Sequence, residues 1–183
     1  MALRKASSYS KNKVGAFTRK SSIKSKAYIK TIPPKIVTKF SMGKDDTSKL
    51  KHHLTLVSCE NVQLRQNAIE SCRQYVHKGL DEKFAGQYFF KIIPYPHHIQ
   101  RENRMLTGAG ADRMSTGMQL SFGVSMNIAA ILKKNSKIFF IALPNEKAVI
   151  FTRELLNKIK SKLPCKTRIE YEFIGKRENK ENQ

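Results

Sequence analysis

The sequence is short of acidic residues, with 14 Asp and Glu against 35 Lys and Arg and a formal net charge of +21. None of the first 44 residues is acidic. A charge this large exceeds what solubility requires and favours a polyanionic partner, nucleic acid above all. Because 40% of the residues are hydrophobic and ten are phenylalanines, the chain is still able to form a core, which excludes a wholly disordered basic protein.

Long apolar runs and paired cysteines are also missing. No stretch approaches the roughly 20 consecutive apolar residues of a membrane span, and the densest run covers only residues 138–143. A membrane-spanning role is therefore excluded. Cys59, Cys72 and Cys165 are widely spaced and form no C-x-x-C pair, so neither a zinc ribbon nor a disulfide framework is indicated. We expect these three to be small buried hydrophobic residues in a reducing compartment.

The motifs of nucleotide-binding and hydrolytic enzymes are absent. Gly108-Ala109-Gly110 lacks the third glycine of G-x-G-x-x-G, because position 113 is Arg, and no strand-to-helix switch follows it. The chain has no G-x-x-x-x-G-K-[ST] and no G-x-S-x-G. An enzyme that uses the glycine segment to hold phosphate remains an alternative, but it lacks a nucleophile and a base.

Histidines and carboxylates do not form a catalytic or metal-binding set either. His52-His53 and His97-His98 are adjacent pairs, and neighbours on a strand point to opposite faces, so neither pair chelates a metal by itself. The carboxylates near the glycine segment lie beside arginines and are expected to pair with them. We predict no catalytic residue, no metal and no cofactor, and hence no enzyme.

Residues 1–34 are predicted to form an extended basic arm, because the segment has little periodicity and no acidic residue. An isolated arm of this kind gains by lying on phosphates, and we expect it to stay unfolded until RNA is present. The composition is also one that a mitochondrial presequence would have, which stays open on composition alone. The residues predicted to contact RNA are Arg4, Lys5, Lys11, Lys13, Arg19, Lys20, Lys24 and Lys26.

Residues 35–174 are predicted to form one α+β domain, with two helices packed on a mostly antiparallel sheet. The helices are expected to start near 61 and at 144–145, with apolar stripes at helical spacing. In the last strand we expect Ile169, Tyr171 and Phe173 to point inward. Residues 175–183 form a polar tail. The predicted strands are 35–40, 51–58, 87–95, 119–132, 136–143 and 167–174.

The segment between the third and fourth predicted strands contains three arginines, three glycines and almost no bulky apolar residue. Such a segment does not build a core. Guanidinium groups suit phosphates and base edges, while glycines let the backbone pass close to another surface. Residues 99–118 are therefore predicted to be a functional loop that touches nucleic acid, with Gly108, Gly110 and Gly117 giving it reach.

The same residues resemble the universal large-subunit ribosomal protein family called L-sixteen in bacteria and L-ten-e in archaea and eukaryotes, with the archaeal branch the closer likeness. The resemblance spans residues 2–174, and it begins within the arm, which favours a ribosomal arm over a cleaved presequence. It is carried by Tyr95–His98, Arg101–Asn103, Met105, Thr107–Arg113, Ser115–Met118, Phe122-Gly123, Ala16–Arg19, Ile32–Ile36, Gln63–Glu70 and Lys162–Pro164.

The resemblance implies an α/β-hammerhead-like domain on large-subunit rRNA, in the cytoplasm, next to neighbouring ribosomal proteins. It also implies that the loop reaches the tRNA acceptor region near the peptidyl-transferase centre. The residues expected to face RNA or tRNA are His97, His98, Arg101, Arg104 and Arg113. The chain departs from the family at Val124–Ile128, where Lys-Pro and a glycine are usual. An RNA-binding protein or chaperone outside the ribosome is the alternative that composition leaves open.

Overall fold

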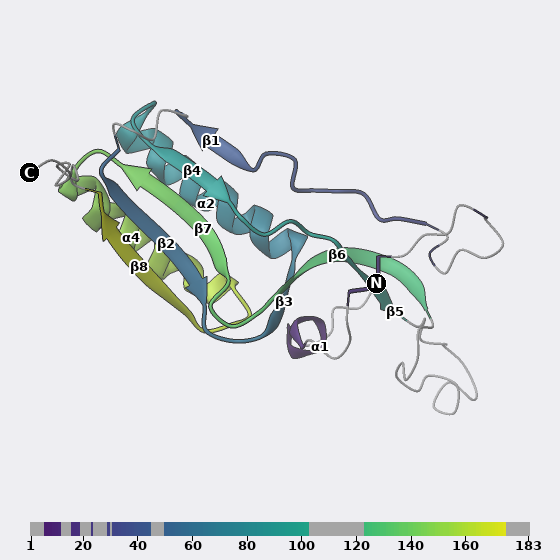
Figure 1. Ribbon diagram of the computed structural model, residues 1–183. Coiled ribbons are helices and arrows are strands. Elements are labelled where there is room, and N and C mark those ends of the chain that lie inside the picture. Colours follow the sequence, from purple (N-terminus) through teal and green to yellow (C-terminus); the bar gives the residue numbers. More distant parts are fainter. Residues whose placement is uncertain are drawn as a thin grey trace, which may run out of the picture.

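The described part of the chain forms two antiparallel sheets and two long helices, shown in the computed structural model of Figure 1. The structure describes residues 6–11, 16–18, 23, 29, 31–44, 50–102 and 123–174. The elements are α1 (Ala6–Ser10), β1 (Ser41–Gly43), β2 (His52–Ser58), β3 (Val62–Arg65), α2 (Gln66–Phe84), β4 (Phe89–Ile92), β5 (His98–Glu102), β6 (Val124–Leu132), β7 (Lys137–Leu143), α4 (Glu146–Ile159), the 3-10 turn η3 (Lys160–Lys162) and β8 (Thr167–Phe173).

The larger sheet has the strand order β1-β4-β7-β2-β8, and the smaller one has the order β3-β6-β5. Every strand pair is antiparallel. Helices α2 and α4 lie together on one face of the five-stranded sheet, whereas α1 lies at the end formed by the three-stranded sheet (Figure 1). The predicted α+β class, with two helices on antiparallel strands, is confirmed.

The core lies between the two long helices and the five-stranded sheet. Leu54 of β2 pairs with Ile141 of β7, and both are fully buried on the helix side. On α2, Ile69, Cys72, Val76 and Leu80 are also fully buried, which confirms the predicted apolar face of this helix.

Burial raises the pKa of the Cys72 thiol to about 11, so this cysteine is protonated and unreactive at neutral pH. All three cysteines are free thiols, and Cys59 and Cys165 are only partly buried.

Two glycines allow close approach in this layer. Gly79 of α2 faces Leu155 of α4, and a Cβ at position 79 would lie 2.9 Å from a Leu155 methyl group. Gly43 ends β1 with a φ of +88°, where a Cβ would overlap the Tyr88 carbonyl oxygen. The helix pair and the β1 edge therefore depend on residues without side chains.

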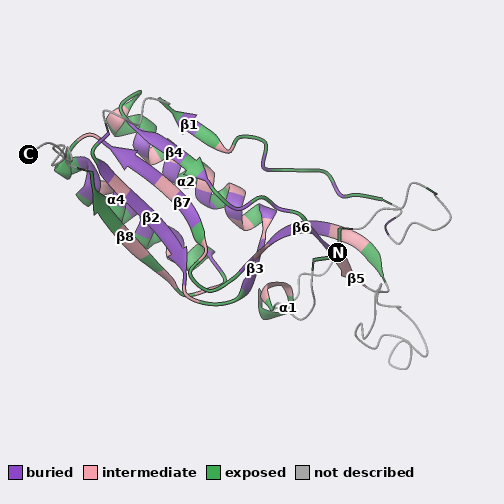
Figure 2. Cartoon of the chain, viewed as in Figure 1, coloured by how far each residue is buried: buried purple, intermediate pink, exposed green. Residues whose placement is uncertain are grey.

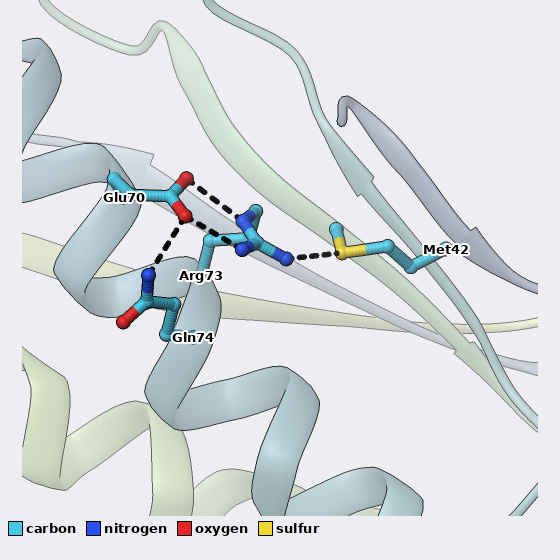
Figure 3. A network of polar contacts seen from close by, with 4 residues as sticks. All are labelled: Met42, Glu70, Arg73 and Gln74. Carbon is cyan, nitrogen blue, oxygen red and sulfur yellow. Dashed lines mark hydrogen bonds and ion pairs between the residues drawn. The ribbon is translucent and has the colours of Figure 1, made fainter. Parts of the chain in front are cut away.

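A polar network holds α2 against β1 (Figure 3). Arg73 donates two hydrogen bonds to Glu70, at 2.8 and 2.6 Å, and a third to the Met42 sulfur at 3.3 Å. Gln74 donates to the same carboxylate. The Arg73 hydrogen bonds hold the pKa of Glu70 below its ordinary value, so the pair remains charged near neutral pH.

Several predicted elements differ from the observed ones. The strand expected at 35–40 is wrong, because this stretch lies outside both sheets and only 41–43 pair with β4. The helix expected from about 61 begins at Gln66 and ends at Phe84, after an unforeseen strand, β3. Helix α1 was not expected in an extended arm. Strand β5 occupies 98–102, so the first residues of the predicted 99–118 loop are a paired strand.

The strands at 52–58, 89–92, 124–132, 137–143 and 167–173 confirm the other predictions, although β6 and β7 belong to different sheets. Figure 2 shows burial concentrated in β2, β4 and β7, with β8 largely exposed. Tyr171 and Phe173 were expected to point inward, but 40% and 57% of their surfaces are exposed. They lie on the helix side of an edge strand that the helices do not fully cover.

Within the described residues, no helix is long and apolar enough to cross a membrane.

Candidate nucleic-acid interface

The predicted site residues that the structure describes gather around the three-stranded sheet. Strand β5 leads into residues 103–122 and β6 leads out of them, with Glu102 opposite Val124 at the last described pair. Lys11, His97, His98 and Arg101 lie among the described residues. Outside them lie Arg4, Lys5, Lys13, Arg19, Lys20, Lys24, Lys26, Arg104, Gly108, Gly110, Arg113 and Gly117.

The first arm contact joins the α1 region to β3 and β5. Gln100 of β5 donates to the Tyr9 carbonyl oxygen at 2.9 Å and to the Gln63 side chain at 3.0 Å. Gln63 in turn donates to the Lys11 carbonyl oxygen at 3.1 Å. The Arg65 guanidinium lies over the Tyr9 ring, 4.2 Å from its centre. Two amides and one cation–π contact thus hold residues 9–11 on the sheet, and they place Lys11 beside it.

The second arm contact adds Phe17 to the outer side of β5. The Phe17 N–H donates to Nδ1 of His98 at 2.8 Å, and the Ile99 N–H donates to the Phe17 carbonyl oxygen at 3.1 Å. The Arg101 guanidinium lies 3.6 Å from the centre of the Phe17 ring. The arm therefore continues the backbone hydrogen bonding of the three-stranded sheet at the point where the chain enters residues 103–122.

This contact fixes the state of two predicted RNA-facing side chains. His98 is 4% exposed, and because its Nδ1 accepts a hydrogen bond, the ring is neutral. Burial lowers the pKa of His98, and the charges of His97 and Arg101 lower it further. Burial also lowers the pKa of Arg101, and its Nη1 has no hydrogen-bond partner among the described residues. His97, by contrast, is exposed, with its Nδ1 3.0 Å from the Tyr95 carbonyl oxygen and its backbone N–H donating to the Ala129 carbonyl oxygen.

The third arm contact is a buried amide pair. Gln66, at the start of α2, donates to the Pro34 carbonyl oxygen at 3.1 Å and accepts from the Ile36 N–H at 3.0 Å. It also donates to the Asn127 side chain of β6 at 2.9 Å. Ser125 donates to the Thr31 carbonyl oxygen. The segment where the chain departs from the family, Val124–Ile128, is thus part of β6, with a register shift against β5 between Ser125 and Asn127, and its polar side chains help to hold residues 31–36.

Sequence reasoning missed these glutamines and Asn127, because an uncharged amide in a strand or helix carries no signal of what it binds. Gln63 and Gln66 do lie within the Gln63–Glu70 stretch that resembles the family, which is the one pointer the sequence offered. The expectation that the whole arm is unfolded without RNA differs from the structure at residues 6–11, 16–18 and 31–34, which contact the sheet.

A small hollow with a volume of about 150 Å³ lies between α1 of the arm and the residues of β3, α2 and η3. Its wall is mainly apolar, with Arg65 at one side, and the Lys162 ammonium points away toward Ser71 and the Tyr75 ring. Within the described part of the chain, no group of three His, Cys, Asp or Glu side chains is placed to hold a metal. The residues that line the hollow are Tyr9, Ser10, Gln63, Arg65, Ala68, Lys162 and Pro164.

Comparison with known proteins identifies the family of this chain. The family model of ribosomal protein L16p/L10e matches residues 17–170. "Large ribosomal subunit protein uL16" of Sulfolobus acidocaldarius is 36% identical over 178 residues, which cover 96% of this chain and 97% of that protein. The proteins of the same name from Saccharolobus islandicus and Saccharolobus solfataricus are 36% identical over 157 residues, 85% of this chain and 84% of theirs. The chain belongs to the L16p/L10e family of ribosomal proteins.

Family membership confirms the resemblance read from the motifs, including its archaeal character. It also agrees with the prediction that the chain is not an enzyme, because the family consists of ribosomal proteins.

Proposed function

We propose that this protein is a structural constituent of the large ribosomal subunit, where it binds large-subunit rRNA and helps to position tRNA near the peptidyl-transferase centre. The names of its archaeal relatives and their near-complete coverage of the chain support the ribosomal place. The net charge of +21 supports RNA as the main partner.

The observation that carries the proposal is that the arm contacts the same small sheet whose strands β5 and β6 lead into and out of residues 103–122. Phe17 of the arm bonds to β5 at His98 and Ile99, a few residues before the segment 103–122 begins. Arm residues that lie on rRNA would therefore fix the base of the loop relative to that RNA. The cations assigned to phosphate contact are Arg4, Lys5, Lys11, Lys13, Arg19, Lys20, Lys24, Lys26, Arg101, Arg104 and Arg113, with His97 and His98 beside them.

A salt wash separates this proposal from an RNA chaperone that acts outside the ribosome. The chain should co-sediment with large subunits after washing in high salt, whereas a transient RNA-binding protein should be released. As an isolated protein it should bind structured RNA mainly through phosphates. If about six to ten phosphates are neutralised, affinity should fall by roughly 10³ to 10⁵ between 50 and 200 mM salt. Release from subunits in the wash would contradict the ribosomal place, and a flat salt dependence would contradict binding through phosphates.

The tRNA role is tested through the loop. Arg104→Ala with Arg113→Ala should leave thermal stability nearly unchanged, since substitutions away from packed sites usually stay within about 0.5 kcal/mol. Large subunits carrying the double variant should assemble but hold tRNA poorly. The matched control is Lys78→Ala with Lys158→Ala, which removes the same charge from exposed positions on α2 and α4. Normal tRNA binding by the loop variant, or equal defects in both, would contradict the role.

A further inference from the structure

The outer edge of β8 is an open end of the five-stranded sheet. In the part of the chain that the structure describes, β8 pairs only with β2, and the order ends there. The pairing runs without a register shift from Ser58 opposite Thr167 to His52 opposite Phe173. The strand contains no proline and no bulge, two of the devices that usually blunt such an edge. A regular row of backbone N–H and C=O groups therefore faces outward.

Apolar side chains are exposed along this same edge. Tyr171 and Phe173 are 40% and 57% exposed, and Ile174, the next residue, is 55% exposed. Buried His52 holds both rings, with Nδ1 2.8 Å from the Tyr171 hydroxyl and its ring centre 5.0 Å from that of Phe173. The two aromatic side chains are therefore fixed in place before any partner arrives.

Helix α4 extends the apolar surface beside the strand. The Arg153 guanidinium lies 5.3 Å from the centre of the Tyr171 ring, and Ile150, three residues earlier on the helix, is 62% exposed. We call Ile150, Tyr171 and Phe173 the β8 patch. The end of β8 that Phe173 forms lies away from the three-stranded sheet and from α1 (Figure 1).

The other face of β8 carries carboxylates. Arg168 pairs with Glu170 at 2.7 Å, while Glu172 is exposed, so the strand has more negative than positive side chains in a chain with a net charge of +21. Carboxylates repel RNA phosphates at short range. This edge thus differs in charge from the surface proposed for rRNA.

We propose that the outer edge of β8 binds an extended, basic segment of a neighbouring large-subunit protein by strand addition. Only a polypeptide complements a row of backbone N–H and C=O groups along its length. Alternate side chains of such a segment reach opposite faces, so apolar ones meet the β8 patch and basic ones meet Glu170 and Glu172.

Two other occupants fit less well. The chain's own residues 175–183 include no apolar side chain that could cover the β8 patch. A second copy of this chain brings another +21 charges, and repulsion between the two opposes pairing.

The inference rests on the proposed place in the large subunit, and photo-crosslinking within assembled subunits tests it. The probe is p-benzoylphenylalanine in place of Phe173, with the same probe in place of Tyr75 on α2 as the control. After irradiation, the Phe173 probe should give an adduct with another protein through a Lys- or Arg-rich extended segment, and the control should not give that adduct. An adduct with rRNA, with residues 175–183 or with a second copy, or no adduct, would overturn the inference.

The two proposals fail in different ways. A chain that is lost from subunits in a salt wash contradicts the proposed function, whereas a retained chain whose probe meets only RNA contradicts the β8 inference alone. If the Phe173 probe prevents folding, as judged by thermal melting, the same probe in place of Ile150 gives the same readout.

Charge reversal tests the chemistry of the partner. Glu172→Lys in the probe-bearing chain should lower the protein adduct about tenfold or more, because like charges would then face each other. Glu82→Lys makes the same change of net charge on α2, where the carboxylate is 64% exposed, and should leave the adduct unchanged. An unchanged adduct in Glu172→Lys would show that the partner segment is not basic, against the proposal.

Discussion

The two ends of this protein are held together by different chemistry. We call the five-stranded sheet with α2 and α4 the body of the protein. Here the two helices cover the sheet with a continuous cluster of buried apolar side chains. At the other end, the arm is held on the three-stranded sheet by amides, one neutral histidine and two cation–π contacts. Apolar burial is not directional, whereas each polar contact needs a particular partner. The stability of the body therefore depends on its total buried apolar area, whereas each arm contact depends on one particular partner group.

The largest expected effect on stability comes from creating a cavity in the apolar core of the body. Phe90→Ala removes a fully buried ring that packs edge-on against Phe139, with ring centres 5.5 Å apart. The free energy of unfolding, measured with urea, should fall by about 3 to 5 kcal/mol. The control Phe173→Ala, at a half-exposed position, should lose about 1 kcal/mol or less. Equal losses would mean that the apolar layer does not dominate stability.

The next effect concerns the buried amide pair. Gln66→Leu keeps the size of the side chain but leaves the Pro34 carbonyl and the Ile36 N–H without their partner. The free energy of unfolding should fall by about 1 to 3 kcal/mol, and amide hydrogen exchange at 31–36 should accelerate. Gln74→Leu, which loses only an exposed bond to Glu70, is the control. Unchanged exchange at 31–36 would show that Gln66 does not hold the arm.

A smaller effect is expected for the cation–π contact between Phe17 and Arg101. A double-mutant cycle with Phe17→Leu and Arg101→Ala should give a coupling free energy of about 1 to 2 kcal/mol, because this guanidinium is partly desolvated. The matched pair is Lys83 and Phe151 in the body, whose ammonium lies 3.9 Å from the ring centre. Its coupling should be nearer 0.5 kcal/mol, since Lys83 is exposed. Equal couplings would remove this distinction between the two regions.

The smallest effect is a pH dependence of the arm contact. The pKa of His98 is lowered in the folded chain below its ordinary value of 6.5, so the unfolded state binds the extra proton more readily. The stabilisation is therefore complete above that ordinary value and is lost as the pH falls through the lower folded pKa. Protonation also removes the acceptor for the Phe17 N–H. Proteolytic cleavage near Phe17 should accelerate as the pH is lowered through this range.

His98→Asn is the control for the pH experiment, because its amide oxygen can accept the same hydrogen bond and does not titrate. The other histidines remain in this variant, so the difference between the two chains isolates His98. Equal acceleration in both would mean that another group controls the arm.

The sequence predicted best the elements whose periodicity is set by the core. β2, β7 and both long helices follow from apolar spacing, because burial against one layer imposes a period on the side chains. β5 was missed because its residues, His-Ile-Gln-Arg-Glu, are mostly polar and pair through β6 and the arm. β3 was read as the start of α2, since Leu64 and Ala68 are spaced as on one helix face.

The site was predictable only in part. Charge and glycine content indicated a nucleic-acid surface around His98 and Arg101, and their RNA contacts stay a prediction. Their contact with Phe17, 81 residues before His98, could not be foreseen, because nothing local in either segment specifies the other. The inward direction expected for Tyr171 and Phe173 failed for a related reason, since alternation assigns a face of the strand but not how far a helix extends over it.

The β6–β7 connection sets the distance between the two surfaces for which we propose partners. Nine residues of β6, at about 3.4 Å each, span roughly 30 Å from the base of the loop to the turn at Asn135. Beyond that short turn the chain enters β7, at the centre of the five-stranded sheet, without a flexible linker. The proposed nucleic-acid surface and the outer edge of β8 are therefore joined by two consecutive strands and a short turn, which keep a fixed spacing between them. A neighbour bound at β8 would hold the loop in position from across the whole length of the molecule.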